Sequence, residues 1–435
     1  MADVTDHSDD LCGFGNLFAS EARPGALPPH QNSPQRVPFG LYAEQLSGSA
    51  FTAPRVHNLR TWAYRLHPSA EHGPFRPAVG RGEGWATGPF VEMPPSPNRE
   101  RWSPLALPDA PTTFLDGVQS LAGTGSPDAQ QGVAVHRYAL TASMTDEAFF
   151  NADGDLLFVP QKGALRVVTE LGAMEIGPGW IGCVPRGLRL RVELLDEGAT
   201  GYLCENYGAP FVLPELGPIG ANGLANPGDF RSPPASFEDV QRPVRLVQKL
   251  GGVFHETKLA HSPFDVVAYR GNFVPYRYEL AHFNTINTVS YDHPDPSIFT
   301  VLTSPSGRAG VANCDFVIFP PRWMVAEHSF RPPWFHRNVM SELMGLVHGR
   351  YDAKADGFLP GGASLHNAQS AHGPDRRTYE GAVVEPMEPR KIDQTLAFMF
   401  ETCQAFRPTR AAMACPSRQQ EYDAVWSGFT RAEVK

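Results

Sequence analysis

Proline and glycine recur so often along this chain that long helices are excluded over most of its length. There are 42 prolines and 41 glycines among 435 residues, and proline is about twice as frequent as in an average protein. Proline breaks helices and glycine supplies turns, so both favour short strands joined by tight loops. We therefore predict a mainly β fold with few helices and irregular Pro/Gly-rich segments.

The clearest strand pattern lies between about residues 154 and 207. Its sequence, DLLFVPQKGALRVVTELGAMEIGPGWIGCVPRGLRLRVEL, contains short β-rich runs separated by turns with Gly or Pro. Leu188–Leu194 alternates apolar and polar side chains, as a strand with one buried face does. A second strand-rich region (INTVSY, SIFTVLTS and GVANCDFVIFPP) follows Phe283. Regularly spaced short strands of this kind predict an antiparallel sandwich or barrel.

Two later segments have less regular patterns. TLAFMFETC, from Thr395, fits either a helix or a strand, and its aromatic content favours the strand. QQEYDAVW, in the tail, has the spacing of a terminal helix.

Charge and cysteine usage narrow the function classes. The net charge is -9, and no run of Lys and Arg suits nucleic acid. No apolar run approaches the ~18 residues that span a bilayer. The six cysteines are scattered without a C-x-x-C pair, which argues against a disulfide framework or a thiolate zinc site. The acidic start MADVTDHSDD has no signal-peptide character, so we expect a cytoplasmic protein with residues 1–11 as a disordered extension.

The segment 332–373 concentrates side chains that bind metals. It holds four histidines (His336, His348, His366 and His372) and a well-placed carboxylate, Glu342, whose immediate surroundings are apolar and low in charge. Neutral imidazole with carboxylate suits Fe(II), Mn(II) or Zn(II). A catalytic non-haem Fe(II) centre typically uses two histidines and one carboxylate and leaves positions open for substrate and O2.

Spacing selects only part of this ligand set. His336 and Glu342 lie six positions apart, so they would share a face of one continuous strand, unless MSELMGL carries Glu342 onto a following element. Spacing leaves the third ligand open among later or flanking histidines: His366, His372, His348 and His328. Each histidine also has a structural interpretation as a hydrogen-bonded residue, and Glu342 could instead pair with Arg337 or Arg350.

Two further residues have alternative interpretations. Tyr351 is either a packed aromatic residue whose hydroxyl contacts solvent, or a hydrogen-bond donor to a substrate oxygen near the metal. His293, in SYDHPDP, is either a turn residue or a general base. The chain has no G-x-x-x-x-G-K-[ST] loop, and GASLHNAQS lacks a G-x-S-x-G nucleophile elbow.

At these residues the chain resembles the homogentisate 1,2-dioxygenase family, the non-haem iron enzymes of phenylalanine and tyrosine catabolism. The resemblance runs from Gly13 to about Phe406. It is carried by QNSPQ, LYAEQLSGSAFTAPR, VPQKG, LGPIGANGLANP, DPSIFTVLT, FVIFPPRW, FLPGG, FRPPWFHRNVMSELMGL and AHGPD. So long a set of uncommon sequence segments is very specific to one family. Residues 1–11 and the tail after about Pro416 match poorly, so no functional residue is carried over there.

The resemblance implies the roles of individual residues. His336, Glu342 and His372 would bind Fe(II), Tyr351 and His372 would contact homogentisate, and His293 would accept a proton. His366 would lie beside the ligands or the substrate. For the acetate arm of the substrate, Arg337 and Asn338 are the candidates. The reaction implied is ring cleavage of homogentisate with O2 to maleylacetoacetate.

The resemblance also implies an architecture. The fold would be cupin-like (jelly-roll), with an N-terminal β-rich domain over residues 12–280 and an iron-binding domain over 281–435. The stretch GALRVVTELGAMEIGPGWIGCVPRG looks like half of a cupin and holds no histidine, so we expect that half to be free of metal. The implied assembly is a homo-hexamer built as a dimer of trimers.

Two other classes of function remain open to the sequence. One is another metal-dependent cupin enzyme, an isomerase or hydrolase that uses the same ligands with Zn or Mn. The other is a non-catalytic two-cupin binding protein, which predicts loss of the ligands in both halves. Here only the first half lacks them.

Overall fold

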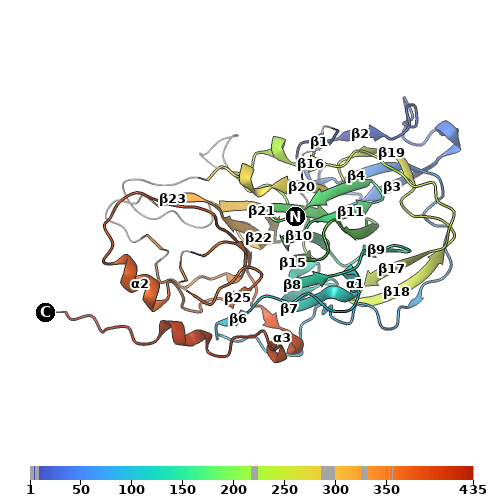
Figure 1. Ribbon diagram of the computed structural model, residues 1–435. Helices are drawn as coiled ribbons and strands as arrows, with labels where there is room; N and C mark the ends of the chain where they lie inside the picture. Colours follow the sequence, from blue (N-terminus) through green and yellow to red (C-terminus); the bar gives the residue numbers. More distant parts are fainter. Residues whose placement is uncertain are drawn as a thin grey trace.

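The computed structural model describes residues 4, 9–216, 224–285, 299–324, 331–332, 334–351, 353–354 and 356–434. Strands dominate these residues, so the prediction of a mainly β fold is confirmed. Figure 1 shows the strands gathered into sheets, with the short helix α2 at one end of the molecule and α3 at its lower edge near β7. There are three large sheets and two small ones in the described part of the chain.

The largest sheet has nine strands and is buried on both faces. On its central strand β10, Leu157 and Val159 join one apolar core, whereas Leu156 and Phe158 join another. This explains why LLFV (residues 156–159) is continuously apolar, because a strand buried on both sides needs no polar face. In spatial order the strands are β1 (Leu11–Cys12), β16 (Arg231–Ser232), β20 (Tyr276–Glu279), β13 (Trp180–Val184), β10 (Asp155–Lys162), β15 (Ala199–Asn206), β8 (Gln131–Leu140), β7 (Val118–Ser126) and β28 (Arg407–Pro408).

A seven-stranded sheet packs on one face of this middle layer. Phe149, Val167 and Val247 from its strands share a core with Leu156 and Phe158. Its β9 and β17 pair in parallel, and its other pairs are antiparallel. In order the strands are β12 (Gly172–Ile176), β11 (Leu165–Thr169), β14 (Leu190–Leu194), β9 (Glu147–Asn151), β17 (Val244–Leu250), β18 (Val253–Leu259) and β5 (Arg76–Pro77).

A six-stranded antiparallel sheet packs on the opposite face and carries the candidate site. Phe316, Leu343 and Phe398 share its core with Leu157 and Val159. In order its strands are β21 (Thr300–Pro305), β22 (Ala312–Phe319), β27 (Leu396–Thr402), β24 (Ser341–His348), β25 (Ala363–His366) and β6 (Glu100–Trp102). The edge strand β6 therefore comes from far earlier in the chain, and Figure 1 shows it beside β25.

The remaining elements are short. A four-stranded sheet has the order β2 (Phe18–Glu21), β19 (Val266–Gly271), β4 (Arg60–Arg65) and β3 (Tyr42–Ser47), and β23 (Arg322–Met324) pairs with β26 (Arg390–Ile392). The α-helices are α1 (Phe114–Gly117), α2 (Arg376–Ala382) and α3 (Arg410–Ala414). The 3-10 helices are Pro38–Gly40, Arg55–His57, Pro227–Asp229, Leu280–His282 and Tyr422–Trp426. No helix in the described ranges could cross a membrane, since even α2 has only 7 residues.

Several local predictions can be compared with these elements. LRLRVEL contains β14 with alternating burial, and TLAFMFETC contains β27, so both strand predictions are confirmed. Within QQEYDAVW, where a terminal helix was expected, Tyr422–Trp426 form a 3-10 helix. INTVSY lies outside the described residues, as do residues 1–3 and 5–8 of the proposed disordered extension. At the end of that extension, Asp10 pairs with Arg277 at 2.6 Å and Leu11 begins β1.

Candidate metal centre

Two of the predicted ligands are joined through their backbones. His336 N–H donates to His372 O at 2.9 Å, and His372 N–H donates to His336 O at 3.1 Å. An antiparallel pair that exchanges both hydrogen bonds places its two side chains on the same side. The imidazole centroids accordingly lie 4.2 Å apart.

Glu342 comes from the following strand and not from the strand of His336. A bend at 339–340 separates the two, and Glu342 is the second residue of β24. Along β24, Leu343 and Gly345 face the middle layer, where Gly345 meets Tyr202. Glu342 and Met344 therefore point to the opposite face, because side chains alternate along a strand.

The three side chains converge on one point. Their ligand atoms all lie within 4.8 Å of one another. The Nε2 of His372 is 3.0 Å from Glu342 Oε2, and the Nε2 of His336 is 4.0 Å from Glu342 Oε1. Two imidazoles and one carboxylate on one side of an ion form the ligand set of a non-haem iron site with open positions.

Backbone carbonyls hold both imidazoles in the tautomer that binds metal. His336 Nδ1 donates to Trp334 O and His372 Nδ1 to Ser370 O, each at 2.8 Å. A carbonyl can only accept, so each neutral ring has its lone pair on Nε2. The Nε2 of His372 then faces a carboxylate oxygen at 3.0 Å. Two lone pairs at that distance repel unless a proton or a metal ion lies between them, which fits a divalent cation.

Burial and neighbouring groups favour the metal-binding protonation states. Burial lowers the pKa of His336, and the nearby His372 lowers it further. Burial works to raise the pKa of Glu342, but the contact with His372 and the hydrogen bond from Asn338 outweigh it and leave that pKa below its ordinary value. At neutral pH the His336 imidazole is therefore neutral and the Glu342 carboxylate is ionised.

A cavity of about 410 Å³ opens beside these ligands. Its walls are largely apolar, from Phe319, Met344, Phe358 and Met399, with polar groups at a few places. This size and lining are typical of a pocket for a small organic ligand.

Comparisons with known proteins agree with this geometry. Residues 9–280 match the family model for the homogentisate 1,2-dioxygenase N-terminal region, and residues 281–433 match the model for its C-terminal region. The chain belongs to the homogentisate 1,2-dioxygenase family. A homogentisate 1,2-dioxygenase from Pseudomonas savastanoi pv. phaseolicola is 58% identical over 419 residues, which cover 96% of this chain and 95% of the relative.

Two solved structures show a distant similarity. A putative dioxygenase from Nostoc punctiforme is 11% identical, with a TM-score of 0.30, and the match covers 74% of this chain and 83% of that one. A Bacillus subtilis oxalate decarboxylase variant is 13% identical, with a TM-score of 0.29, over 73% of this chain and 76% of that one. We draw no conclusion about the site from these two likenesses.

The other residues predicted for this homogentisate dioxygenase family member lie around the cavity or away from it. Tyr351, His366, Arg337 and Asn338 line the cavity. His348 is exposed at the end of β24, and its Nδ1 lies 3.3 Å from Gln394 O. His293 and His328 lie outside the described residues.

Asn338 and His366 have well-defined partners. The Asn338 amide donates to Glu342 Oε1 at 3.1 Å and also to Glu401 Oε1, so it orients a predicted ligand. His366 lies opposite Glu342 on β25, and its ring stacks on His372 with centroids 4.1 Å apart. Its Nε2 meets the Tyr422 hydroxyl at 2.9 Å.

Sequence reasoning missed three side chains at this site. Arg101 and Lys354 line the cavity, and Tyr422 contacts His366 from the tail. Arg101 comes from an edge strand more than 200 residues before the ligands. Tyr422 lies in the tail after Pro416, and the expectation that this tail matches the family poorly was wrong, because the C-terminal family model extends to residue 433. The one available signal for Lys354 was a lysine close to the predicted substrate contact, Tyr351.

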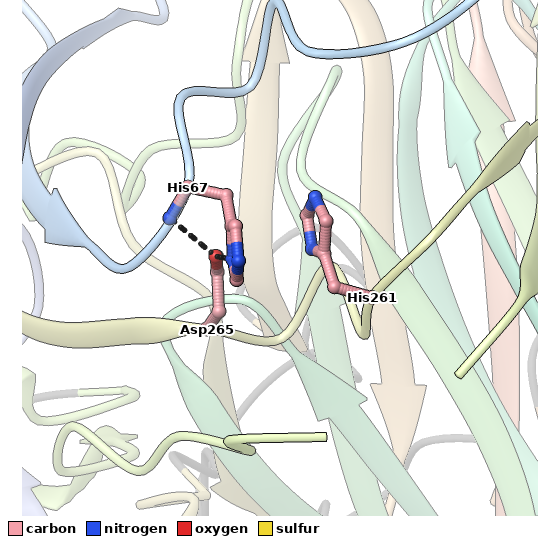
Figure 2. Close-up of side chains that lie close together, drawn as sticks. All are labelled: His67, His261 and Asp265. Atoms are coloured by element: carbon pink, nitrogen blue, oxygen red, sulfur yellow. Dashed lines mark hydrogen bonds and ion pairs between the residues drawn. The ribbon is translucent and has the colours of Figure 1, made fainter. Parts of the chain in front are cut away.

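A second group of potential metal ligands occurs in the N-terminal half. The ligand atoms of His67, His261 and Asp265 also lie within 4.8 Å of one another (Figure 2). However, Asp265 Oδ1 binds Arg65 at 2.9 Å, and Asp265 Oδ2 accepts from the backbone and Nδ1 of His67 at 2.9 and 3.0 Å. The two rings stack with centroids 3.8 Å apart and planes 14° apart.

Stacked rings cannot share one ion in ordinary geometry. The lone pair of an imidazole nitrogen lies in its ring plane, so the lone pairs of His67 and His261 run in nearly parallel planes. An ion at the usual ~2.0–2.1 Å from both nitrogens would lie well out of both planes. We therefore interpret this group as a structural anchor around the Arg65–Asp265 ion pair.

Proposed function

We propose that this chain cleaves the aromatic ring of homogentisate with O2 to maleylacetoacetate, at a ferrous ion bound by His336, Glu342 and His372. The observation that carries the proposal is the convergence of two Nε2 atoms and one carboxylate on the wall of an apolar cavity. Membership of the homogentisate 1,2-dioxygenase family supplies the substrate and the reaction. A ferrous ion at this position would supply the electron transfer that allows O2 to react with an aromatic ring.

The residues of the chain position the reactants. The carbonyls of Trp334 and Ser370 fix the two imidazoles, and Asn338 fixes the carboxylate, so the ligand set is preorganised. Apolar walls exclude water and hold the ring against the ligands. Tyr351, which is largely buried between Phe319 and Phe358, is proposed to contact the substrate together with His372.

His293 is proposed as the acceptor of the phenolic proton. A neutral imidazole suits this role, because deprotonation of the hydroxyl raises the electron density of the ring. The support for this assignment is the family resemblance around SYDHPDP, since His293 lies outside the described residues.

An oxygen-electrode assay with homogentisate, after anaerobic loading with Fe(II), tests the function. The wild-type protein should consume O2 and form maleylacetoacetate, whereas Zn(II)-loaded protein should not. Oxygen consumption also separates this activity from that of a metal-dependent isomerase or hydrolase. A failure to consume O2 with full iron occupancy would refute the proposal.

Iron content distinguishes ligands from other residues. His336→Ala and Glu342→Ala should each lose iron, and His293→Ala should keep iron and lose turnover. The matched control is His348→Ala, because His348 is exposed and does not line the cavity. If His336→Ala kept both full iron and activity, the ligand assignment would be wrong.

Assembly and location belong to the same proposal. We propose a homo-hexamer, a dimer of trimers, and a cytoplasmic location within phenylalanine and tyrosine catabolism. The support is membership of the family. Light scattering of the purified chain tests the assembly.

A further inference from the structure

Two buried cations line the cavity, and no described carboxylate lies within ion-pair distance of either. Arg101 is 1% exposed and Lys354 is 6% exposed. Neither has an ion pair, and Nε and Nη2 of Arg101 donate to no acceptor. A buried charge that lacks an opposite charge is costly, so its presence beside a cavity points to an anionic ligand.

The sheet register places Arg101 relative to the metal ligands. Across the sheet, Glu401, Glu342 and His366 lie opposite one another in one row. Met399, Met344, Ser364 and Arg101 form the next row on the same face. Two residues along a strand span about 6.6 Å. Arg101 therefore lies one row along from Glu342 and two strands away, on β6. This separation leaves room for an aromatic ring between the predicted metal ligands and the guanidinium.

Aromatic rings and backbone carbonyls hold the two cations in place. The Arg101 guanidinium lies over the Tyr422 ring, with Cζ 3.8 Å from the centroid, and Nη1 has one long contact of 3.5 Å to Asp356 O. Lys354 Nζ donates to Gly373 O at 2.6 Å and lies 4.1 Å from the centroid of Trp426. These contacts are neutral. The one carboxylate whose charge acts on both cations is that of Asp375, and it forms no ion pair with either of them, so the two positive charges are only partly balanced.

The other charged groups nearby have partners of their own. Arg99 is paired with Asp423 at 2.7 Å, and Asp375 accepts from Thr378 N at 2.7 Å at the start of α2. Glu342 and Glu401 lie in the same row of the sheet, and both accept hydrogen bonds from the Asn338 amide. Burial lowers the pKa of Lys354 well below its ordinary value, and the charge of Arg101 lowers it further. An anion beside the two groups would relieve this repulsion.

We propose that Arg101 and Lys354 form the subsite for the carboxylate of the substrate side chain. This rests on the proposed function, because homogentisate is a ring with an acetate arm. The sequence had indicated Arg337 and Asn338 for this role. Both donor hydrogens of Asn338 are used by Glu342 and Glu401, and Arg337 is exposed, so the cavity geometry favours Arg101 and Lys354. When the substrate carboxylate is bound there, the two ring hydroxyls have a fixed orientation relative to the metal ligands.

Paired ligands with and without the carboxylate charge test this subsite. We would measure binding of homogentisate and its methyl ester to the Fe(II)-loaded protein without O2, by titration calorimetry. Lys354→Met keeps the side-chain length and removes the charge, and Arg101→Lys is a conservative second variant. The control is Arg377→Gln, which removes an exposed cation paired with Asp356 outside this cavity.

The wild type should bind homogentisate at least about tenfold more tightly than the ester. Lys354→Met should weaken homogentisate binding about 10- to 100-fold, the range for a charged hydrogen bond, and should leave ester binding within about threefold. Arg101→Lys should act in the same direction, and Arg377→Gln should match the wild type. Equal weakening of both ligands, or an ester bound by the wild type as tightly as homogentisate, would overturn the subsite.

Binding of phenylacetate to the metal-free protein separates this inference from the proposed function. Phenylacetate has the acetate arm and no hydroxyls, so its binding should depend on Lys354 without any turnover. If the wild type consumed no O2 with homogentisate and phenylacetate binding still required Lys354, the reaction would be wrong and the subsite would stand.

Discussion

Lys249 offers a quantitative test of how the two N-terminal layers are joined. It is fully buried on β17, and its Nζ contacts Glu205 Oε1 of β15 at 2.6 Å and Asp153 Oδ2 at 2.8 Å. Glu205 is fully buried as well, and Asn151 Nδ2 donates to it at 2.7 Å. Lys249→Met removes the cation and leaves two buried carboxylates without it.

The pKa of Glu205 gives the size of the expected effect. Burial works to raise this pKa, but Lys249 and His136 outweigh burial and lower it from 4.5 to about 2. A depression of that size corresponds to about 3 kcal/mol of unfolding free energy at neutral pH. Breaking a buried ion pair by removing one partner typically costs about 3–5 kcal/mol, which agrees. At about 0.9 kcal/mol per kelvin for a chain of this length, Tm should fall by about 3–6 °C.

The pH dependence has a definite sign. Because the folded-state pKa of Glu205 is depressed, its stabilisation is present above about pH 4.5 and is lost as the pH falls toward 2. Lys249→Met removes the largest influence that lowers the Glu205 pKa and leaves burial opposed only by His136, so the Glu205 pKa rises in the variant. The loss of stability is therefore largest at neutral pH and decreases on acidification. The difference in Tm between wild type and variant should therefore narrow from pH 7.5 to pH 5.

Thermal unfolding followed by circular dichroism measures these differences. Lys258→Met is the matched control, because Lys258 is exposed on the neighbouring strand β18. The double variant Lys249→Met/Glu205→Gln should recover part of the lost Tm, since it also removes the charge of one buried carboxylate that Lys249→Met leaves without its cation. A Tm within 1 °C of wild type for Lys249→Met, or a gap that widens at pH 5, would refute this reasoning.

Two further predictions concern the metal site. Asn338→Leu removes the amide that orients Glu342, so Fe(II) affinity should fall about 10- to 100-fold in a competition with a chelator; unchanged affinity would show that the amide does not support the ligand. Tyr422→Phe removes the hydroxyl that contacts the fully buried His366, so the unfolding free energy should fall by about 1–3 kcal/mol in denaturant titrations. A loss no larger than that of Tyr379→Phe, whose ring lies near Phe335 and Phe429, would exclude this role for Tyr422.

The sequence predicts the strands and the metal-binding segment because both depend on local patterns. Alternation in LRLRVEL and Gly/Pro turns come from neighbouring residues, and the histidines near Glu342 occupy one short segment. Spacing could not choose His372 over His366. That choice follows from the backbone bridge between His336 and His372, which forms only when two loops meet.

The position of Arg101 at the cavity depends on long-range pairing that no spacing rule contains. Arg101 reaches the site because β6 pairs with β25, and Tyr422 reaches His366 because the tail crosses the same end of the sheet. The layered arrangement could not be predicted either, since a continuous apolar run such as LLFV (residues 156–159) does not say which two sheets will cover it. These features are fixed by tertiary packing.

The origin of β6 has a consequence for cutting or recombining the gene. The two family models meet between residues 280 and 281, yet the sheet that carries the predicted ligand Glu342 has residues 100–102 as its edge strand. A fragment that starts at 281 would carry His336, Glu342 and His372 but would leave the outer edge of β25 unsatisfied and would lack Arg101. Chimeras between relatives should therefore take residues 100–102 and the C-terminal half from the same parent.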